Sequence, residues 1–315
     1  MMDAEGLQNL SVSIKEKARE LGFDLCGIAR SRPLDEYKPA FKEWLESGMN
    51  DNMRYLGRDI EKRHNPGLLY PGIKSLVVTG INYFSEIKQK DPGSSVLSRY
   101  AYGSDYHEVI GKKLERLLSY IKSFISDADG KVFVDSAPLL EKAWAKEAGL
   151  GWQGKHSVVI NKEIGSFFFI GIMTLNISLD YDEPFNDDLC GDCRICIDSC
   201  PTGAINRNRT VDARKCIANL TIENKEPVPV ELIPLFEGRI FGCDKCQEVC
   251  PWNKKAQQSD IPEFAINEEV ASMTAAEWQS LSRERFKKLF SNSAVGRVKY
   301  EKFIHNIITL TKSGS

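Results

Sequence analysis

Cysteine spacing constrains the fold of this chain more than any other sequence feature. Eight of its nine cysteines lie between residues 190 and 250, in the run C-G-D-C-R-I-C-I-D-S-C-P (190–201), the run C-D-K-C-Q-E-V-C-P (243–251) and the intervening Cys216. The first run has the spacing C-x2-C-x2-C-x3-C-P, in which three thiolates surround one cubane cluster and the fourth reaches a second cluster. The sequence therefore predicts two 4Fe–4S clusters in a ferredoxin-like arrangement.

The second run has one cysteine fewer than the first, and Cys216 is the only spare cysteine nearby. By the exchange of fourth ligands that this spacing implies, the predicted ligands of one cluster are Cys190, Cys193, Cys196 and Cys250. The predicted ligands of the other cluster are Cys200, Cys216, Cys243 and Cys246. Zinc also binds C-x2-C pairs, but the triple run with C-P at both ends favours iron–sulfur. The isolated Cys26 is interpreted as a buried small hydrophobe.

The net charge and the apolar segments of the sequence bear on where the protein is located and what it binds. The formal net charge is −2, which gives no overall sign of a nucleic-acid binder. No apolar run is long enough to cross a bilayer, and the first residues lack the basic and apolar segments of a signal peptide. We therefore expect a cytoplasmic protein without a membrane partner, in which thiols stay reduced and bind metal rather than form disulfides.

The pattern of apolar residues predicts an α/β fold, because helical and strand-like segments alternate up to about residue 180. Helices are expected over residues 10–21, 37–47 and 106–125, and strands over 23–28 and 73–83. Residues 131–152 predict a strand, a turn and a helix, and two further strands flank a turn at 163–165. Beyond residue 251 the sequence becomes helical, most clearly over 274–290.

Five segments resemble those of a known family in order and spacing. They are S-R-Y-A-Y-G-S-D-Y-H (98–107), V-F-V-D-S-A-P-L-L-E-K-A-W-A-K-E-A-G-L-G-W-Q-G-K-H-S-V-V-I (132–160), C-I-D-S-C-P-T-G-A-I (196–205), D-A-R-K-C-I-A-N-L-T-I-E (212–223) and R-I-F-G-C-D-K-C-Q-E-V-C-P-W-N (239–253). The chain thus resembles the epoxyqueuosine reductases, which are cobalamin-dependent iron–sulfur enzymes of queuosine synthesis in tRNA. Many members have a longer C-terminal tail of HEAT-like helices, so this chain resembles a shortened member.

The resemblance implies a particular domain organisation. A nitroreductase-like cobalamin-binding domain is expected over 1–180, followed by a ferredoxin-like domain with two 4Fe–4S clusters over 181–255. A short helical segment is expected over 256–315, where it could contact tRNA. The resemblance also suggests a monomer.

The resemblance further implies that an epoxide oxygen is removed as water from epoxyqueuosine at the wobble position of tRNA, which needs two electrons and two protons. The clusters would pass electrons from an external low-potential donor to cobalamin. The family's proton donor falls on Asp135, where the end of an apolar strand is expected to desolvate the carboxyl partly and raise its pKa. From the residues alone, Asp135 could equally cap a helix beginning near Pro138, a role for which Ser136 is at least as suitable.

Cobalamin contacts are carried over from the matching segments. The predicted contacts are Arg58, Ser98, Tyr100, Asp135, Ser136, Lys142, Gly154, Lys155, His156, Ser157, Gly242 and Asp244. The D-x-H-x-x-G box that supplies a cobalt-ligating histidine is absent, and His107, in a near match one residue too long, is expected to be structural. The resemblance implies cobalamin without a protein histidine ligand. Flavin also stays open, because flavin enzymes share the nitroreductase-like core.

Basic residues near the clusters and in the C-terminal segment are candidates for contacts with tRNA phosphates. They are Arg207, Arg209, Arg214, Lys215, Lys254, Lys255, Arg283, Arg285, Lys287 and Lys288. Taken alone, a short run of basic residues is more often part of a solvent-exposed surface than an RNA-binding site. Their expected grouping near the cobalt favours a role in RNA binding.

Three other functions fit parts of the pattern. One is a corrinoid reductive dehalogenase or another corrinoid reductase acting on a small molecule, although dehalogenases commonly carry a twin-arginine export signal that is not seen here. The second is a non-catalytic electron carrier, against which the large α/β domain argues. The third is a zinc-binding RNA module, which metal analysis would distinguish.

Overall fold

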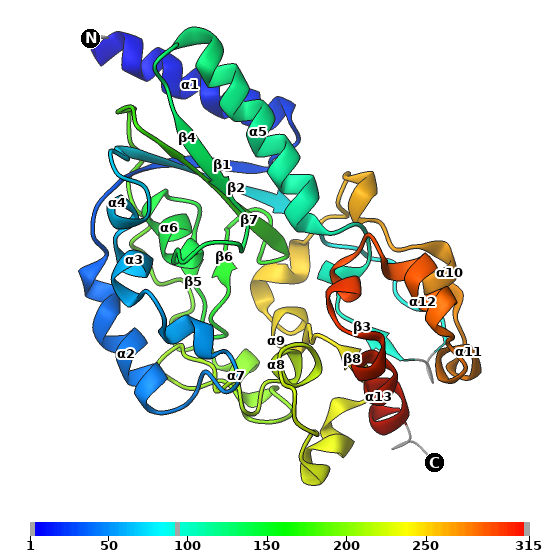
Figure 1. Cartoon of the computed structure of the whole chain (residues 1–315). Helices are drawn as coiled ribbons and strands as arrows, with labels where there is room; N and C mark the ends of the chain where they lie inside the picture. Colours follow the sequence, from blue (N-terminus) through cyan, green and yellow to red (C-terminus); the bar gives the residue numbers. More distant parts are fainter. Residues whose placement is uncertain (1–3, 92–94, 312–315) are drawn as a thin grey trace.

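A four-stranded sheet lies at the centre of the N-terminal half of the computed structural model, which describes residues 4–91 and 95–311 (Figure 1). Its strands, in spatial order, are β1 (Leu25–Arg30), β2 (Ser75–Asn82), β7 (Phe168–Leu175) and β4 (Gly130–Phe133). Every pairing in this sheet is antiparallel. Strand β2 is buried at all of its positions, which requires that both faces of the sheet be covered.

Two long helices, α1 (Ala4–Glu20) and α5 (Tyr106–Phe124), cover one face of the sheet (Figure 1). In α1, Leu10, Ile14 and Ala18 recur at every fourth position and form one apolar stripe. This stripe shares a core with the buried leucines of α5 and with the sheet. Both helices were expected from their spacing, and the structure confirms them.

The opposite face of the sheet is covered by α6 (Glu141–Glu147), whose Trp144 is fully buried. Gly27 of β1 lies against the end of this layer, and a Cβ atom there would lie 2.0 Å from the carbonyl oxygen of Ala148. The core on this face also contains side chains of β2 and β7. The remaining elements of this half are α2 (Lys38–Glu46), α3 (Ile60–His64), α4 (Pro66–Leu69), β5 (Trp152–Gln153) and β6 (Val159–Ile160).

The cysteine-rich part contains three short helices and one strand. They are α7 (Ile195–Asp198), α8 (Ile217–Ile222), β8 (Arg239–Phe241) and α9 (Lys245–Glu248). Strand β8 pairs in parallel with β3 (Val96–Leu97), which comes from the N-terminal half of the chain. This pairing joins the cysteine-rich part to the segment that follows residue 95.

The C-terminal helices pack on the cysteine-rich part rather than forming a separate core. They are α10 (Glu268–Ser272), α11 (Ala275–Gln279), α12 (Arg283–Phe290) and α13 (Tyr300–Leu310). Their buried Trp278 and Phe303 share one core with Ile217 and Phe241, and α13 lies beside β8 (Figure 1). None of the helices in the described ranges is long and apolar enough to cross a membrane.

The single helix expected over 274–290 is wrong, because the chain breaks between α11 and α12. Ser282 is the N-cap of α12 and accepts a hydrogen bond from the backbone nitrogen of Arg285. Leu281 is buried beside this break. A serine at an N-cap stabilises a new helix start, so the polar S-L-S segment at 280–282 separates two helices. The other short turns are 3-10 segments at Asp35–Tyr37, Arg54–Gly57, Arg99–Ala101, Val230–Phe236, Pro251–Lys255, Pro262–Phe264 and Ala294–Arg297.

Candidate active site and metal centres

The two cysteine runs converge on a cavity of about 270 Å³. Its walls include four of the predicted cluster ligands, Cys190, Cys193, Cys196 and Cys250, together with Lys155, His156, Ile160, Leu189, Pro251 and Trp252. Burial and the three neighbouring thiols raise the pKa of Cys196 to about 11. Four thiols around one mostly apolar cavity are a donor set that fits a 4Fe–4S cluster. We call these four cysteines the first cysteine set.

The other four predicted ligands also come together, and we call Cys200, Cys216, Cys243 and Cys246 the second cysteine set. Burial, together with neighbouring thiols, raises the pKa of Cys243 to about 11 and the pKa of Cys246 well above its usual value. The backbone nitrogen of Ala204 donates to the Cys200 sulfur at 3.3 Å. These four thiols lie close enough to perturb one another, and they are a donor set that fits a second 4Fe–4S cluster.

Asp135 lies just beyond the end of β4, on an exposed turn with a left-handed backbone (φ 50°). The Tyr106 hydroxyl donates to its Oδ2 at 3.1 Å. Its backbone nitrogen donates to Glu141 Oε1 at 2.7 Å. The partial burial expected for Asp135 is therefore wrong, because β4 ends at Phe133 and the chain turns outward.

The alternative capping role for Asp135 or Ser136 is also wrong. Helix α6 begins at Glu141, not near Pro138, and its N-cap residue is Leu140, whose side chain makes no capping hydrogen bond. The Ser136 hydroxyl instead accepts from the backbone nitrogen of Val134 at 3.3 Å. Neither side chain satisfies the start of α6, so Asp135 is free for another function.

Charged groups around Asp135 perturb one another. Burial, followed by the charge of Asp135, raises the pKa of Glu141 to about 8. The surrounding protein lowers the pKa of Lys142 by desolvation, although its side chain is accessible to solvent. The pKa of Lys142 is raised in the opposite direction by nearby negative charges, which are those of Asp135, Glu141 and two thiols of the second cysteine set. Lys142 thus lies close enough to both Asp135 and the second cysteine set to interact with their charges.

Four other predicted cobalamin contacts meet where β3 and β8 pair. Gly242 has a positive φ of 72°, and a Cβ atom there would lie 2.5 Å from Ser98 Cβ. Asp244 accepts hydrogen bonds from the Ser98 hydroxyl and from the Arg99 backbone nitrogen, so both of its oxygens are used within the protein. Tyr100 lies 6.3 Å, between ring centroids, from Tyr106. This tyrosine pair links the group to Asp135.

Arg58 and the segment 154–157 take different positions. Arg58 is exposed after the 3-10 segment Arg54–Gly57. Lys155 donates to the carbonyl oxygens of Gly191 and Cys193, at 2.6 and 2.8 Å. Gly154 lies in the same β5–β6 loop, where Ser157 has a positive φ of 65° and its hydroxyl accepts from the Gln153 side-chain amide at 3.1 Å. The loop therefore lies against the first cysteine set.

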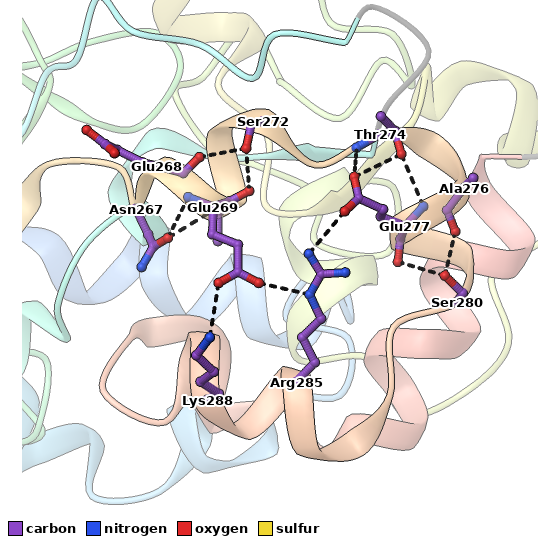
Figure 2. A network of polar contacts seen from close by, with 11 residues as sticks. Asn267, Glu268, Glu269, Ser272, Thr274, Ala276, Glu277, Ser280, Arg285 and Lys288 are labelled. Carbon is purple, nitrogen blue, oxygen red and sulfur yellow. Dashed lines mark hydrogen bonds and ion pairs between the residues drawn. The ribbon is translucent and has the colours of Figure 1, made fainter.

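Five of the ten basic residues predicted to bind tRNA are paired with carboxylates. Arg209 pairs with Asp188, and Arg214 pairs with Asp212 at 2.9 Å. Glu269 lies between Arg285 and Lys288, and Glu277 also contacts Arg285 (Figure 2). The distances from the Glu269 oxygens to the nitrogens of Arg285 and Lys288 are 2.9 and 3.4 Å. Arg283 pairs with Glu301. The other five, for which the described structure gives no ion pair, are Arg207, Lys215, Lys254, Lys255 and Lys287.

Sequence reasoning missed several residues of this site. Tyr106 and Glu141 both contact Asp135, and both lie in the segments that carry the family resemblance. Trp152 lies at the first cysteine set, where its indole nitrogen donates to Cys190. Proximity in the fold identifies them, because no spacing rule links a tyrosine at 106 to an aspartate at 135. His107, expected to be structural, lies at the start of α5, and its backbone and ring nitrogens contact the N-cap carboxylate of Asp105.

Comparison with known proteins gives a consistent result. Residues 189–253 match the family model "4Fe-4S double cluster binding domain", and residues 63–136 match "Epoxyqueuosine reductase QueG, DUF1730". The epoxyqueuosine reductase of Cellulophaga algicola is 43% identical over 93% of this chain and 95% of its own length. A crystal structure of epoxyqueuosine reductase with an epoxyqueuosine-modified tRNA-Tyr stem loop is 30% identical, with a TM-score of 0.89 over 97% of this chain and 81% of that chain.

A more distant likeness concerns the fold alone. The reductive dehalogenase NpRdhA in complex with 3-bromo-4-hydroxybenzoic acid is 16% identical to this chain. The match covers 98% of this chain but only 39% of that one, with a TM-score of 0.51. It supports the α/β architecture and does not favour dehalogenation as the reaction.

Proposed function

Because the chain belongs to the epoxyqueuosine reductase family, we propose that it reduces epoxyqueuosine to queuosine at the wobble position of tRNA. The observation that carries this proposal is the position of the exposed Asp135, with Lys142 between it and the second cysteine set. The predicted electron-transfer centre and an acid thus lie on either side of one lysine. The proposed reaction needs both, since the epoxide oxygen leaves as water after two electrons and two protons are added.

The two cysteine sets fit two 4Fe–4S clusters, and we assign cobalamin as the further cofactor, because one distantly similar structure is that of a reductive dehalogenase described as B12-dependent. We assign Cys190, Cys193, Cys196 and Cys250 to one cluster, and Cys200, Cys216, Cys243 and Cys246 to the other. Cobalamin would be held by Ser98, Tyr100, Lys142 and Gly242. When bound, the clusters supply single electrons and cobalamin supplies a cobalt centre that becomes strongly nucleophilic on reduction.

Side chains of the protein donate the protons that the reaction needs. Tyr106 donates to Asp135 and so orients its carboxyl on the turn after β4. Burial, with the charge of Asp135, raises the pKa of Tyr106, which therefore keeps its proton and remains a donor. Asp135 gives a proton to the departing epoxide oxygen. Glu141, with a pKa of about 8, is mostly protonated near neutral pH and can return a proton to this region.

Binding of tRNA is assigned to the basic residues without local carboxylate partners. Arg207 and Lys215 flank the second cysteine set, and Lys254 and Lys255 follow Cys250. An unpaired cation on the surface can release counterions when it meets a phosphate, whereas one held by a carboxylate has less to gain. The external electron donor, the monomeric state and the cytoplasmic location remain predictions.

The test is a reconstitution under anaerobic conditions with iron, sulfide and cobalamin. A low-potential reductant and epoxyqueuosine-containing tRNA are then added, and the digested nucleosides are weighed by mass spectrometry. Loss of the mass of one oxygen atom, only when cobalamin is present, would support the reaction. The Asp135→Asn variant is the matched control, and it should retain both cofactors while turning over about 10²- to 10⁴-fold more slowly. If protein with both cofactors verified converts nothing, the proposed substrate is wrong.

A further inference from the structure

The β5–β6 hairpin supplies a hydrogen-bond donor to the first cysteine set. Trp152, in β5, is only 2% exposed, and its indole Nε1 donates to the Cys190 sulfur at 3.4 Å. A nitrogen–sulfur hydrogen bond is longer than one between nitrogen and oxygen because sulfur is larger. This contact is the only one in the described structure in which a side-chain nitrogen donates to a sulfur atom of the first cysteine set.

Packing fixes the direction of this donor. The Trp152 ring stacks on Phe185, with ring centroids 5.5 Å apart, and meets Trp252 edge-on at 4.9 Å. Lys155, three residues later, holds the carbonyl oxygens of Gly191 and Cys193. The hairpin and the cysteine loop are therefore joined at several points. The indole cannot rotate away from Cys190 without disturbing this packing.

His156 is a second candidate donor, through its Nε2 atom. It is 3% exposed and lines the cavity bounded by the first cysteine set. Its Nδ1 accepts from the backbone nitrogen of Val158 at 3.2 Å, so the proton of the neutral ring must be on Nε2. Burial lowers the pKa of His156 to about 4, which keeps the ring neutral.

The Nε2 atom of His156 has no hydrogen-bond partner among the described residues. Buried donors in folded proteins are nearly always paired, because an unpaired one loses its bond to water without replacement. The group that fills the cavity is the available partner. A 4Fe–4S cluster offers sulfide and thiolate sulfurs as acceptors on all sides.

We propose that Trp152 and His156 donate hydrogen bonds to sulfur atoms of the cluster held by the first cysteine set, and that they thereby raise its reduction potential. The reduced cluster carries one more negative charge than the oxidised one, so N–H donors stabilise the reduced form more. The inference rests on the ligand assignment made for the proposed function, but not on the substrate. It places His156 at a cluster rather than at the corrin.

The experiment measures the midpoint potential of each cluster in the reconstituted holoprotein, by a redox titration followed by electron paramagnetic resonance. Trp152→Phe keeps the aromatic packing and removes the N–H. His156→Leu removes the second donor, while His156→Gln keeps an N–H near the position of Nε2. Trp152→Phe and His156→Leu should each make one-electron reduction of this cluster about tenfold less favourable, which is a shift of about 59 mV to a more negative potential. The glutamine variant should stay close to the wild type.

The second cluster is the internal reference, and its potential should not move. Unchanged potentials in both Trp152→Phe and His156→Leu would overturn the proposal, as would equal shifts in the leucine and glutamine variants. If a variant fails to assemble its cluster, the wild-type protein labelled with 15N at the tryptophan and histidine side chains decides the matter. Pulsed resonance on the reduced cluster should then detect couplings to both ε nitrogens, and their absence would overturn the proposal. An iron content of one cluster per chain would instead contradict the ligand assignment.

Discussion

Replacing Arg99 with methionine should destabilise the protein strongly, because it leaves a buried carboxylate without its counter-charge. Arg99 and Asp244 are only 6% and 8% exposed, and their side chains lie 3.2 Å apart. The guanidinium also donates to the Ser85 carbonyl at 3.0 Å and to Glu248 at 2.8 Å. Methionine would retain apolar volume against the ring of Phe84, so the loss is mainly electrostatic.

The size of the destabilisation follows from the burial of the Arg99–Asp244 pair. Removing one partner of a buried ion pair lowers the free energy of unfolding by about 3–5 kcal/mol. The pair with Glu248, which is 35% exposed, adds at most about 1 kcal/mol. The expected loss in the free energy of unfolding is thus about 3–6 kcal/mol, a large part of the roughly 5–15 kcal/mol that stabilises a typical domain. Because burial already raises the pKa of Asp244, proton uptake can relieve part of the loss, which should therefore be smaller at low pH.

The assay is an anaerobic urea titration of the holoprotein, in which the unfolding midpoint should fall by about 1–2 M. The control is the double variant Arg99→Met/Asp244→Asn. An asparagine oxygen can accept from the backbone nitrogen of residue 99 while its amide donates to the Ser98 hydroxyl, so the double variant should recover about half of the loss or more. A single variant within about 1 kcal/mol of the wild type, or a double variant no more stable than the single, would refute the reasoning.

Glu141→Gln should flatten the dependence of the unfolding free energy on pH. The pKa of Glu141 is about 8 in the folded protein and lies above its value in the unfolded chain, so protonated Glu141 stabilises the fold fully below about pH 4.3, and this contribution is lost as the pH rises to about 8. Urea unfolding midpoints measured across this pH range would reveal the difference. Phe303→Ala should lower the free energy of unfolding by about 3–5 kcal/mol, because this fully buried ring packs on Trp278 in the C-terminal core. A thermal unfolding midpoint near that of the wild type would contradict this prediction. Lys287→Glu should weaken tRNA binding and lower the slope of log affinity against log salt by about one. Arg285→Met, which removes a cation already held by Glu269, is its control and should leave the slope unchanged in a filter-binding series.

Short sequence patterns predict the cysteine sets and the long helices of this protein well. The cysteine spacing brings two sets of four thiols together, because C-x2-C turns are determined within a few residues. Helices α1 and α5 follow from their apolar stripes. The two-residue strand β3 has no such signal, since a strand that short cannot display a period of two, and its parallel pairing with β8 depends on the whole fold.

The site is harder to predict from sequence because its geometry depends on tertiary contacts. The end of an apolar strand suggested a desolvated Asp135, but the left-handed turn that exposes it could not be read from V-F-V-D-S-A-P. The contact between Tyr106 and Asp135 joins the start of α5 to the end of β4, which only the packed layers bring together. The basic residues show the same limit, since ion pairs such as Arg285–Glu269 join different helices.

The core shared by Leu97, Phe241 and Phe303 has a consequence for how the molecule can be assembled. Its three parts are separated by more than a hundred and by about sixty residues along the chain, so the core cannot close until α13 has been synthesised. A ribosome-bound chain that has emerged only as far as residue 250 carries all the cysteines but lacks α10 to α13. Iron insertion into the second cysteine set should therefore be efficient only after α13 has emerged from the ribosome, and fragments ending before α13 should be poor acceptors of a cluster.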